Sequence, residues 1–363
     1  MNERIRWIFS NCQDGLDAIV IMNAEEPLLD VAFPYITCTK AGLFEGCLGV
    51  ITPDGRSTII TSALEETSAR GGKSEVLIYR TRKERDELAS GFMKKFRTVG
   101  VNGQGITHAN YLEIDRLTPN AELLDVSKGL ETSRLIKDRD EIDRIRRACG
   151  IASRVADDIP GLLRKGMTEY EAAAEIDYRM MKLGASGTAF GTNASFGASS
   201  AEPHHGAEDI VLKEGHVALF DFGCKVDGYC SDITRTFFVN EVKDWQEHMY
   251  QVVLEAQGAA LATIKAGANG KDVDAAARKV IDASEFKGLM VHSTGHGLGL
   301  SVHDGGRMAL DHDFLLKEGM VLTVEPGVYI AGRGGVRIED DVLITKDGYE
   351  MLTDASKEMK VIT

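Results

Sequence analysis

Short runs of β-branched and other apolar residues alternate with stretches of helical spacing in the first third of the chain. These runs lie at residues 17–21, 49–64, 75–80 and 98–103. The run at 49–64 is interrupted by Pro53-Asp54-Gly55, and a turn of this composition between two β-branched segments predicts a β-hairpin. The alternation of strands and helices predicts an α/β domain over residues 1–125.

The apolar pattern then changes to that of long helices. Hydrophobic residues recur every three or four positions between Ile142 and Ile159, which predicts a helix with one buried face. Thr168 and Glu171 form the signature of a capping box, which predicts the start of a second helix. A loop rich in Gly, Ser and Ala follows over residues 191–206, and strands follow the loop.

The segment between the two patterns is polar. We interpret residues 126–138 as a linker and residues 139–363 as a second domain. A chain of 363 residues is long enough for two domains that each bury a hydrophobic core.

Two parts of the second domain repeat each other. LKEGHVALFD matches LKEGMVLTVE, and each copy ends in an acid, Asp221 or Glu325, 104 positions apart. Upstream, the Ala triplet of EYEAAAEI matches that of DVDAAARKVI at an offset of 103. A period near one hundred is too long for a solenoid. The repeat therefore predicts two similar halves about a pseudo-two-fold axis, with an acid at an equivalent place in each.

The first of these acids lies in another predicted hairpin. If Asp227 and Gly228 form its two-residue turn, Asp232 lies opposite Gly223. Because side chains alternate between the two faces, Asp232 is then the diagonal neighbour of Asp221 on one face, roughly 7 to 8 Å away at the backbone. Two carboxylates can converge on a cation there, with the glycine clearing space between them.

The alternative is that these two acids face solvent on an exposed sheet. The flanking segments VALF and ITRTFFV are too apolar for a solvated hairpin. Buried paired acids without a cation or a proton are strongly unfavourable. We therefore favour a cation site.

Further candidate ligands lie downstream. Glu325 and Glu339 belong to a similar predicted hairpin, and three histidines precede it within twelve residues: His292, His296 and His303. We expect the turn between the two glutamates to be made by the glycines at 332, 334 and 335.

Glycines on both sides of His296, at 295, 297 and 299, let the backbone bend and approach a ligand closely. A single histidine in such a segment is more often a hydrogen-bonded core residue. Because two acidic hairpins flank this segment, we interpret His296 as a ligand.

One histidine and four carboxylates form an oxygen-rich ligand set. Such a set suits Mn(II) first in our interpretation, also suits Fe(II) or Co(II), and permits Zn(II). Four anionic ligands exceed what one divalent ion normally collects, so we expect two ions about 3.5 to 4 Å apart with a bridging water as the nucleophile.

Composition and charge exclude several other classes. The chain is 43% hydrophobic and 27% charged, with a net charge of -14, which argues against nucleic acid as a partner. No apolar stretch approaches the roughly 18 residues of a membrane span, and the six cysteines form no CxxC pair. We expect no membrane partner, reduced thiols and a cytoplasmic location.

Four motifs of the second domain resemble those of a known family. The spaced pair of aspartates within VDGYCSDITRT, then GHGLGLSVHD, VEPGVYI and GGVRIED, resemble in that order the pita-bread metallopeptidases, in the branch of prolidase and aminopeptidase P. The match begins near residue 135, and the first domain looks like the creatinase-type N-terminal domain. The resemblance implies an α+β pita-bread catalytic domain, hydrolysis of Xaa-Pro bonds in short proline-containing peptides, and a homodimer.

The resemblance also implies roles for the ligands. Asp221 would chelate one metal, Asp232 and Glu339 would bridge both, and His296 and Glu325 would complete the shells. Glu325 would in addition take the proton from the bridging water as general base.

Further residues are implied around the metals. His303 resembles the histidine that contacts the substrate carbonyl, and His204 the substrate-side histidine, with His205 as an alternative that the doubled histidine leaves open. Arg337 shares the face of Glu339 and would orient it, unless it is an ordinary surface arginine. Arg307 resembles the position that meets a substrate carboxylate in prolidases.

Several alternatives remain at this stage. The sequence does not separate a dipeptidase from an aminopeptidase. Methionine aminopeptidase chemistry is disfavoured by the additional N-terminal domain, and metal-free creatinase chemistry by the complete ligand set. A non-catalytic pita-bread module that binds proteins is a further alternative, which metal analysis would test.

Overall fold

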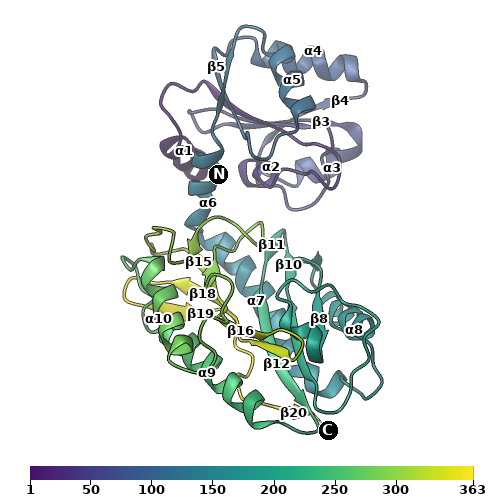
Figure 1. Cartoon of the computed structure of the whole chain (residues 1–363). Helices are drawn as coiled ribbons and strands as arrows, with labels where there is room; N and C mark the ends of the chain where they lie inside the picture. Colours follow the sequence, from purple (N-terminus) through teal and green to yellow (C-terminus); the bar gives the residue numbers. More distant parts are fainter. Residues whose placement is uncertain (363) are drawn as a thin grey trace. The chain divides into compact units, whose positions relative to one another are not determined.

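The computed structural model describes residues 1–362. The chain divides into two compact units, Met1–Arg134 and Leu135–Thr363. Figure 1 labels many of the helices and strands of both units, and each unit is described by itself. None of the helices within residues 1–362 combines the length and the apolar character that a membrane crossing requires.

The first unit contains one six-stranded sheet in the order β4-β3-β2-β1-β5-β6. Its elements are α1 (Asn2–Asn11), β1 (Ala18–Met22), α2 (Ala32–Thr37), β2 (Leu48–Ile51), β3 (Ser57–Ser62), η1 (Ala63–Glu65), α3 (Glu66–Arg70), β4 (Glu75–Tyr79), α4 (Arg82–Met93), β5 (Thr98–Val101), α5 (His108–Leu117) and β6 (Glu122–Asp125). The predicted hairpin at 49–64 is confirmed, because β2 and β3 pair antiparallel with Ile51 opposite Ser57.

The helix α6 (Ser127–Leu135) occupies most of the segment predicted as a linker. It is followed by α7 (Arg139–Leu162) and α8 (Glu169–Lys182). The first of these long helices was predicted from its apolar spacing and the second from the capping box of Thr168 and Glu171, which is present.

The rest of the second unit alternates short strands with one pair of helices. Its elements are β7 (Gly187–Thr188), β8 (Asn193–Phe196), η2 (Gly197–Ala201), β9 (Val217–Phe222), β10 (Cys224–Val226), β11 (Tyr229–Cys230), β12 (Ile233–Val239), α9 (Asp244–Leu261), α10 (Gly270–Asp282), β13 (Gly295–His296), β14 (Arg307–Met308), β15 (Val321–Val324), β16 (Gly327–Ile330), β17 (Gly334–Arg337), β18 (Asp340–Ile344), β19 (Tyr349–Met351) and β20 (Val361–Ile362).

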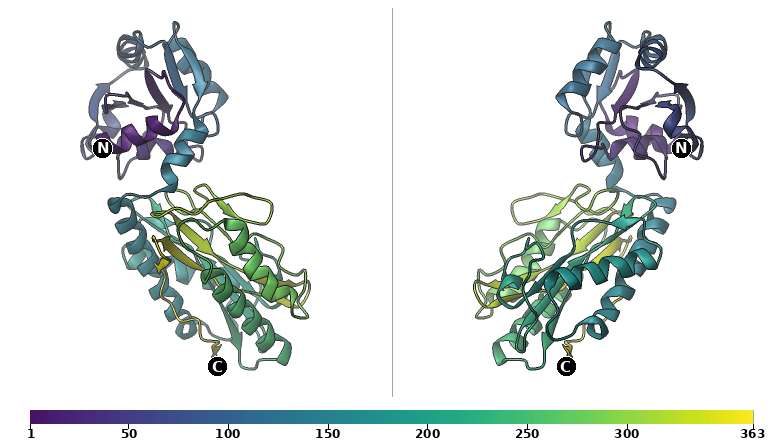
Figure 2. Two further views of the ribbon diagram at one scale, coloured as in Figure 1. Left: turned by 90° about the vertical axis from the view of Figure 1, so that its left-hand side faces the viewer. Right: turned by 90° about the vertical axis from the view of Figure 1, so that its right-hand side faces the viewer.

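The strands of this unit lie between two helix pairs, α7 with α8 and α9 with α10 (Figure 2). One buried cluster joins α7 and α8 to β9 and β12, and another joins α9 and α10 to β15 and β18. The predicted repeat therefore corresponds to two packed halves, with α8 and β9 in one and α10 and β15 in the other. This is the pita-bread arrangement implied by the resemblance.

One prediction within this unit was wrong. The segment 191–206 was expected to be a loop, but its residues Asn193–Phe196 form β8, which pairs antiparallel with β9. Asn and Ala are depleted in strands, so the pairing with a buried neighbour outweighs local preference here.

Candidate metal centre

The hairpin that carries Asp221 and Asp232 has the predicted register. Val226 lies opposite Tyr229 next to the turn, and Thr234 lies opposite Asp221 further along. The turn residues Asp227 and Gly228 both have positive φ, 48° and 85°, as a two-residue hairpin turn of the favoured hand requires. Asp221 and Asp232 consequently share one face of the ribbon.

Gly223 is required in this hairpin for a different reason than expected. The prediction was that it clears space between the carboxylates. In the structure, a Cβ atom at Gly223 would lie 1.8 Å from the carbonyl oxygen of Ser231. The missing side chain therefore permits the close approach of two backbone segments.

The second hairpin also keeps one register on both sides of its acids. Val324 lies opposite Asp340, and Gly327 lies opposite Arg337, which places Glu325 and Glu339 across from each other. Of the three glycines expected in the turn, Gly332 lies there with a φ of 72°. The other two, at 334 and 335, belong to β17 instead.

His296 reaches the same place from β13. Its ring Nδ1 bonds the carbonyl of Gly297 at 3.1 Å, so Nε2 is left facing the acids. This Nε2 lies 3.4 Å from Glu325 Oε1 and 3.8 Å from Asp232 Oδ2. Ligand atoms of Asp232, His296 and Glu339 all lie within 4.8 Å of one another.

A cavity of about 470 Å³ joins these side chains. It is lined by all five predicted ligands and by His204, His303 and Arg337. Within residues 1–362, the buried Oδ1 atoms of Asp221 and Asp232 have no hydrogen-bond partner. Since an unpaired buried oxygen is costly, these two atoms fit a bound cation.

The electrostatics of the cavity point the same way. Burial raises the pKa of Asp232 well above its usual range, and the neighbouring charges of Glu339 and Asp221 raise it further. Burial likewise raises the pKa of Glu339, followed by repulsion from Glu325. Burial lowers the pKa of His296, which favours the neutral imidazole that metal binding requires. Clustered acids of this kind ionise together when a cation joins them.

Arg337 is buried, with 3% of its surface exposed, and is not a surface arginine. Its guanidinium donates to the carboxylate of Asp221, to the hydroxyl of Thr234 at 3.0 Å, and to the hydroxyl of Tyr329 at 2.7 Å. Thr234 in turn donates to Glu339 Oε2 at 2.6 Å. Arg337 thus binds one acid directly and reaches Glu339 through a threonine.

Two side chains at the site, one lining the cavity and one behind it, received no role from sequence. His292 lines the cavity, and its Nε2 lies 2.8 Å from the hydroxyl of Tyr329, which also accepts from Arg337. Burial lowers the pKa of His292. The cluster of three histidines was a signal for His292, whereas Tyr329 stands in an apolar strand that carries no comparable signal.

The structure distinguishes the two adjacent histidines, His204 and His205. His204 lines the cavity, whereas His205 is turned away from it, because its Nε2 lies 2.8 Å from the buried carboxylate of Glu169. The same carboxylate accepts hydrogen bonds from Ser199 and from the backbone N–H of Glu208. Glu169 therefore anchors the loop from which His204 projects.

The two remaining predicted residues lie on the next segment. The ring of His303 stands edge-on to that of His296, with 4.2 Å between the centroids. Arg307 is half exposed and pairs with Asp311 at 2.9 Å. It is opposite His296 in the pairing of β13 with β14, yet it is not among the residues that line the cavity.

Comparison with known proteins identifies a family for each of the two units. Residues 143–346 match the family model of metallopeptidase family M24, and residues 11–136 match the creatinase/prolidase N-terminal domain. The Xaa-Pro dipeptidase of Pyrococcus furiosus is 36% identical over 86% of this chain and 88% of its own length.

Solved structures are also similar over nearly the whole chain. The Xaa-Pro dipeptidase from Bacillus anthracis has a TM-score of 0.90 at 32% identity, covering 99% of this chain and 98% of that one. The X-Pro aminopeptidase from Thermotoga maritima has a TM-score of 0.89 at 32% identity, covering 96% and 98%. The resemblance noted in the sequence motifs is thereby confirmed, and the chain belongs to metallopeptidase family M24, with a creatinase/prolidase N-terminal domain before its catalytic unit.

Proposed function

We propose that this protein is a two-metal peptidase that hydrolyses Xaa-Pro bonds in short peptides. The observation that carries the proposal is the convergence of Asp232, His296 and Glu339 within 4.8 Å, beside unpaired buried oxygens of Asp221 and Asp232. Support for the substrate class comes from the relatives, which are named as Xaa-Pro dipeptidases and an X-Pro aminopeptidase.

In this proposal the five ligands are those predicted: Asp221, Asp232, His296, Glu325 and Glu339. Manganese is our first choice, with cobalt, iron or zinc as alternatives, because the set is rich in oxygen. Two bound divalent ions would acidify a water and polarise the scissile carbonyl.

The protein supplies the proton transfers and the hydrogen bonds. Glu325 lies 3.4 Å from the His296 ring at the cavity wall, where its carboxylate can take a proton from the attacking water. His303 and His204 line the same cavity and would donate to charge that develops on the substrate carbonyl. Arg337 would hold Asp221 in place.

Substrate length depends on how the free carboxylate end is treated. We propose that Arg307 meets that carboxylate if the enzyme is a dipeptidase. Arg307 already pairs with Asp311 in an exposed position, and such pairs are weak enough for a ligand carboxylate to displace. An aminopeptidase would leave this end open and gain nothing from Arg307.

The deciding experiment loads the purified protein with Mn(II) and compares hydrolysis of Ala-Pro, Ala-Pro-Ala and Ala-Ala. We expect cleavage of at least one proline peptide and none of Ala-Ala. Faster cleavage of Ala-Pro, lost in Arg307→Ala, would identify a dipeptidase. Failure to cleave either proline peptide with manganese, cobalt, iron or zinc would contradict the proposed function.

Asp232→Ala is the matched variant for the metal assignment. It should lower kcat below detection and reduce the bound metal measured by elemental analysis, because one bridging carboxylate is lost. Full activity in this variant would overturn the assignment of Asp232. Light scattering of the same preparations tests the predicted homodimer.

A further inference from the structure

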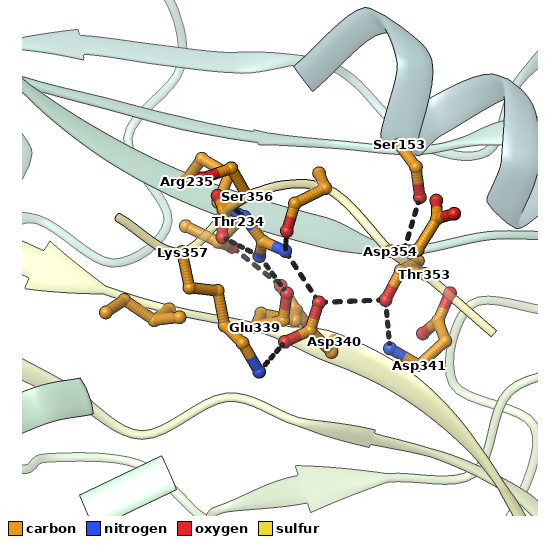
Figure 3. A network of polar contacts seen from close by, with 12 residues as sticks. Ser153, Thr234, Arg235, Glu339, Asp340, Asp341, Thr353, Asp354, Ser356 and Lys357 are labelled. Carbon is orange, nitrogen blue, oxygen red and sulfur yellow. Dashed lines mark hydrogen bonds and ion pairs between the residues drawn. The ribbon is translucent and has the colours of Figure 1, made fainter. Parts of the chain in front are cut away.

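A buried polar network surrounds Asp340, the residue that follows Glu339 and begins β18 (Figure 3). At its centre are Arg235, with 2% of its surface exposed, and Asp340, which is fully buried. Arg235 is the residue after Thr234 on β12, so the two side chains leave the strand on opposite faces. The network belongs neither to the cavity nor to either hydrophobic core.

The guanidinium of Arg235 uses all of its N–H groups. It donates to the carbonyl of Glu339 at 2.6 Å and to that of Thr234 at 3.0 Å. It also donates to Asp340 Oδ1 at 2.7 Å and to two carbonyls of the C-terminal segment, Ser356 at 3.1 Å and Ala355 at 2.8 Å. The planar fork of an arginine can make such a set of bonds in only one orientation.

The carboxylate of Asp340 has four side-chain partners. Besides Arg235, its oxygens accept from Thr353 at 2.9 Å, from Gln257 at 2.9 Å and from Lys357 at 3.0 Å. A buried carboxylate with this many partners holds its neighbours in a fixed arrangement, and removing one partner of such a pair is costly.

Glu339 connects this network to the candidate metal centre. Its carboxylate accepts from the hydroxyl of Thr234 at 2.6 Å, its N–H donates to the carbonyl of Thr234 at 3.2 Å, and its own carbonyl accepts from Arg235. Two consecutive residues of β12 therefore hold Glu339 by its side chain and by both of its peptide groups.

We propose that Arg235 is a positioning residue for Glu339. Through Asp340 and the carbonyls of residues 355 and 356, it ties the C-terminal segment to the start of β18, next to Glu339, and fixes the position of the bridging carboxylate. This proposal rests on the two-metal function proposed above. It concerns residues that contact neither metal nor substrate, so it acts on metal affinity and on coordination geometry.

A purely structural role is the alternative, in which the network only fastens the C-terminal segment. Ser153→Ala is the matched control, because the Ser153 hydroxyl accepts from the N–H of Asp354 at 2.9 Å. It fastens the same segment from α7 and does not touch Glu339. The two roles therefore predict different metal binding for variants of similar stability.

The experiment uses the full chain with Arg235→Lys, which retains the charge and loses the fork. Mn(II) affinity is measured by calorimetry, the visible absorption of the Co(II) form reports on ligand geometry, and the thermal midpoint of the metal-free protein reports on stability. We expect Arg235→Lys to weaken Mn(II) binding at least about tenfold and to change the Co(II) spectrum. Ser153→Ala should keep both while lowering the midpoint.

Unchanged affinity and an unchanged spectrum in Arg235→Lys would overturn the proposal, as would equal losses in Ser153→Ala. If Arg235→Lys does not fold, Lys357→Met decides, because it removes one partner of Asp340 from a partly exposed position. It should weaken Mn(II) binding in the same direction by a smaller factor, and wild-type affinity in it would refute the positioning role. A wild-type protein that binds no metal would instead refute the proposed function.

Discussion

At the scale of single residues, the candidate ligands could be proposed from sequence, whereas most contacts of the residues around them could not. Asp221 and Asp232 follow from turn chemistry and strand alternation, which depend on neighbours within one hairpin. The partners of Arg337 come from β9, β12 and β16, which no local pattern brings together. The same holds for Arg235, whose bonds reach more than one hundred residues along the chain.

The separation of His204 from His205 leads to a prediction at this scale. His204→Ala should lower kcat/KM about 100-fold, as the loss of one donor to developing charge does, with little change in urea stability. His205→Ala should instead lower the free energy of unfolding by about 1 to 3 kcal/mol, because it leaves the buried Glu169 carboxylate short of a donor. Steady-state kinetics and urea titration of both variants check this. An exchange of the two phenotypes would reverse the assignment.

At the scale of elements, the two hairpins and the two repeated helices were predicted well because each has its own signal. Thr168 and Glu171 cap α8 through their own side chains, and the Asp227-Gly228 turn sets the register of β10 with β11. The strand β8 was missed because its stability comes from β9 and its own residues favour a loop. Sequence patterns do not reveal a strand such as β8, whose structure depends on pairing with a neighbouring strand.

Gly223 gives a prediction about the first hairpin. A Cβ atom there would lie 1.8 Å from the Ser231 carbonyl, which is backbone and cannot move aside cheaply. Gly223→Ala should therefore destabilise the second unit by about 3 kcal/mol or more, at or above the usual range for overpacking. Gly191→Ala is the control, since a Cβ there would meet nothing within 4 Å. Equal urea midpoints for the two variants would show that the hairpin relaxes.

At the scale of the whole molecule, the chain offers one tryptophan in each unit. Trp7 lies in α1 and donates to the carbonyl of Ser133, and Trp245 lies in α9 beneath the guanidinium of Arg333. Variants that retain one tryptophan can therefore report on each unit separately.

Metal binding gives a prediction that uses these two reporters. A ligand that binds only the folded state raises its stability by mass action, and all five candidate ligands belong to the second unit. Saturating Mn(II) should raise the thermal midpoint followed by Trp245 in Trp7→Phe, by a larger amount than the midpoint followed by Trp7 in Trp245→Phe. Equal shifts would mean that the reporters do not resolve the units.

The first unit carries its own pH dependence. Hydrogen bonds from Arg116 lower the pKa of Glu113 to about 2, and the charge of Arg85 adds to this effect. Because the folded pKa lies below the unfolded value of about 4.3, this stability is present above that value and is lost as the pH falls toward 2. Glu113→Gln should cost about 1 kcal/mol at pH 7, and its difference from wild type should close between pH 5 and 2. Fluorescence of Trp7 during urea titration measures it, and a difference that grows at low pH would contradict the assignment.

Three acids in sequence, Glu339, Asp340 and Asp341, have three separate tasks. Glu339 faces the cavity, Asp340 faces the network of Arg235, and Asp341 accepts from the backbone N–H of Asp232 at 2.9 Å. Successive side chains of an extended segment point to opposite sides. One residue inserted or deleted just before these acids would therefore turn all three side chains to the wrong side at once. Loops that are grafted onto this scaffold should therefore preserve the alternation of these three side chains.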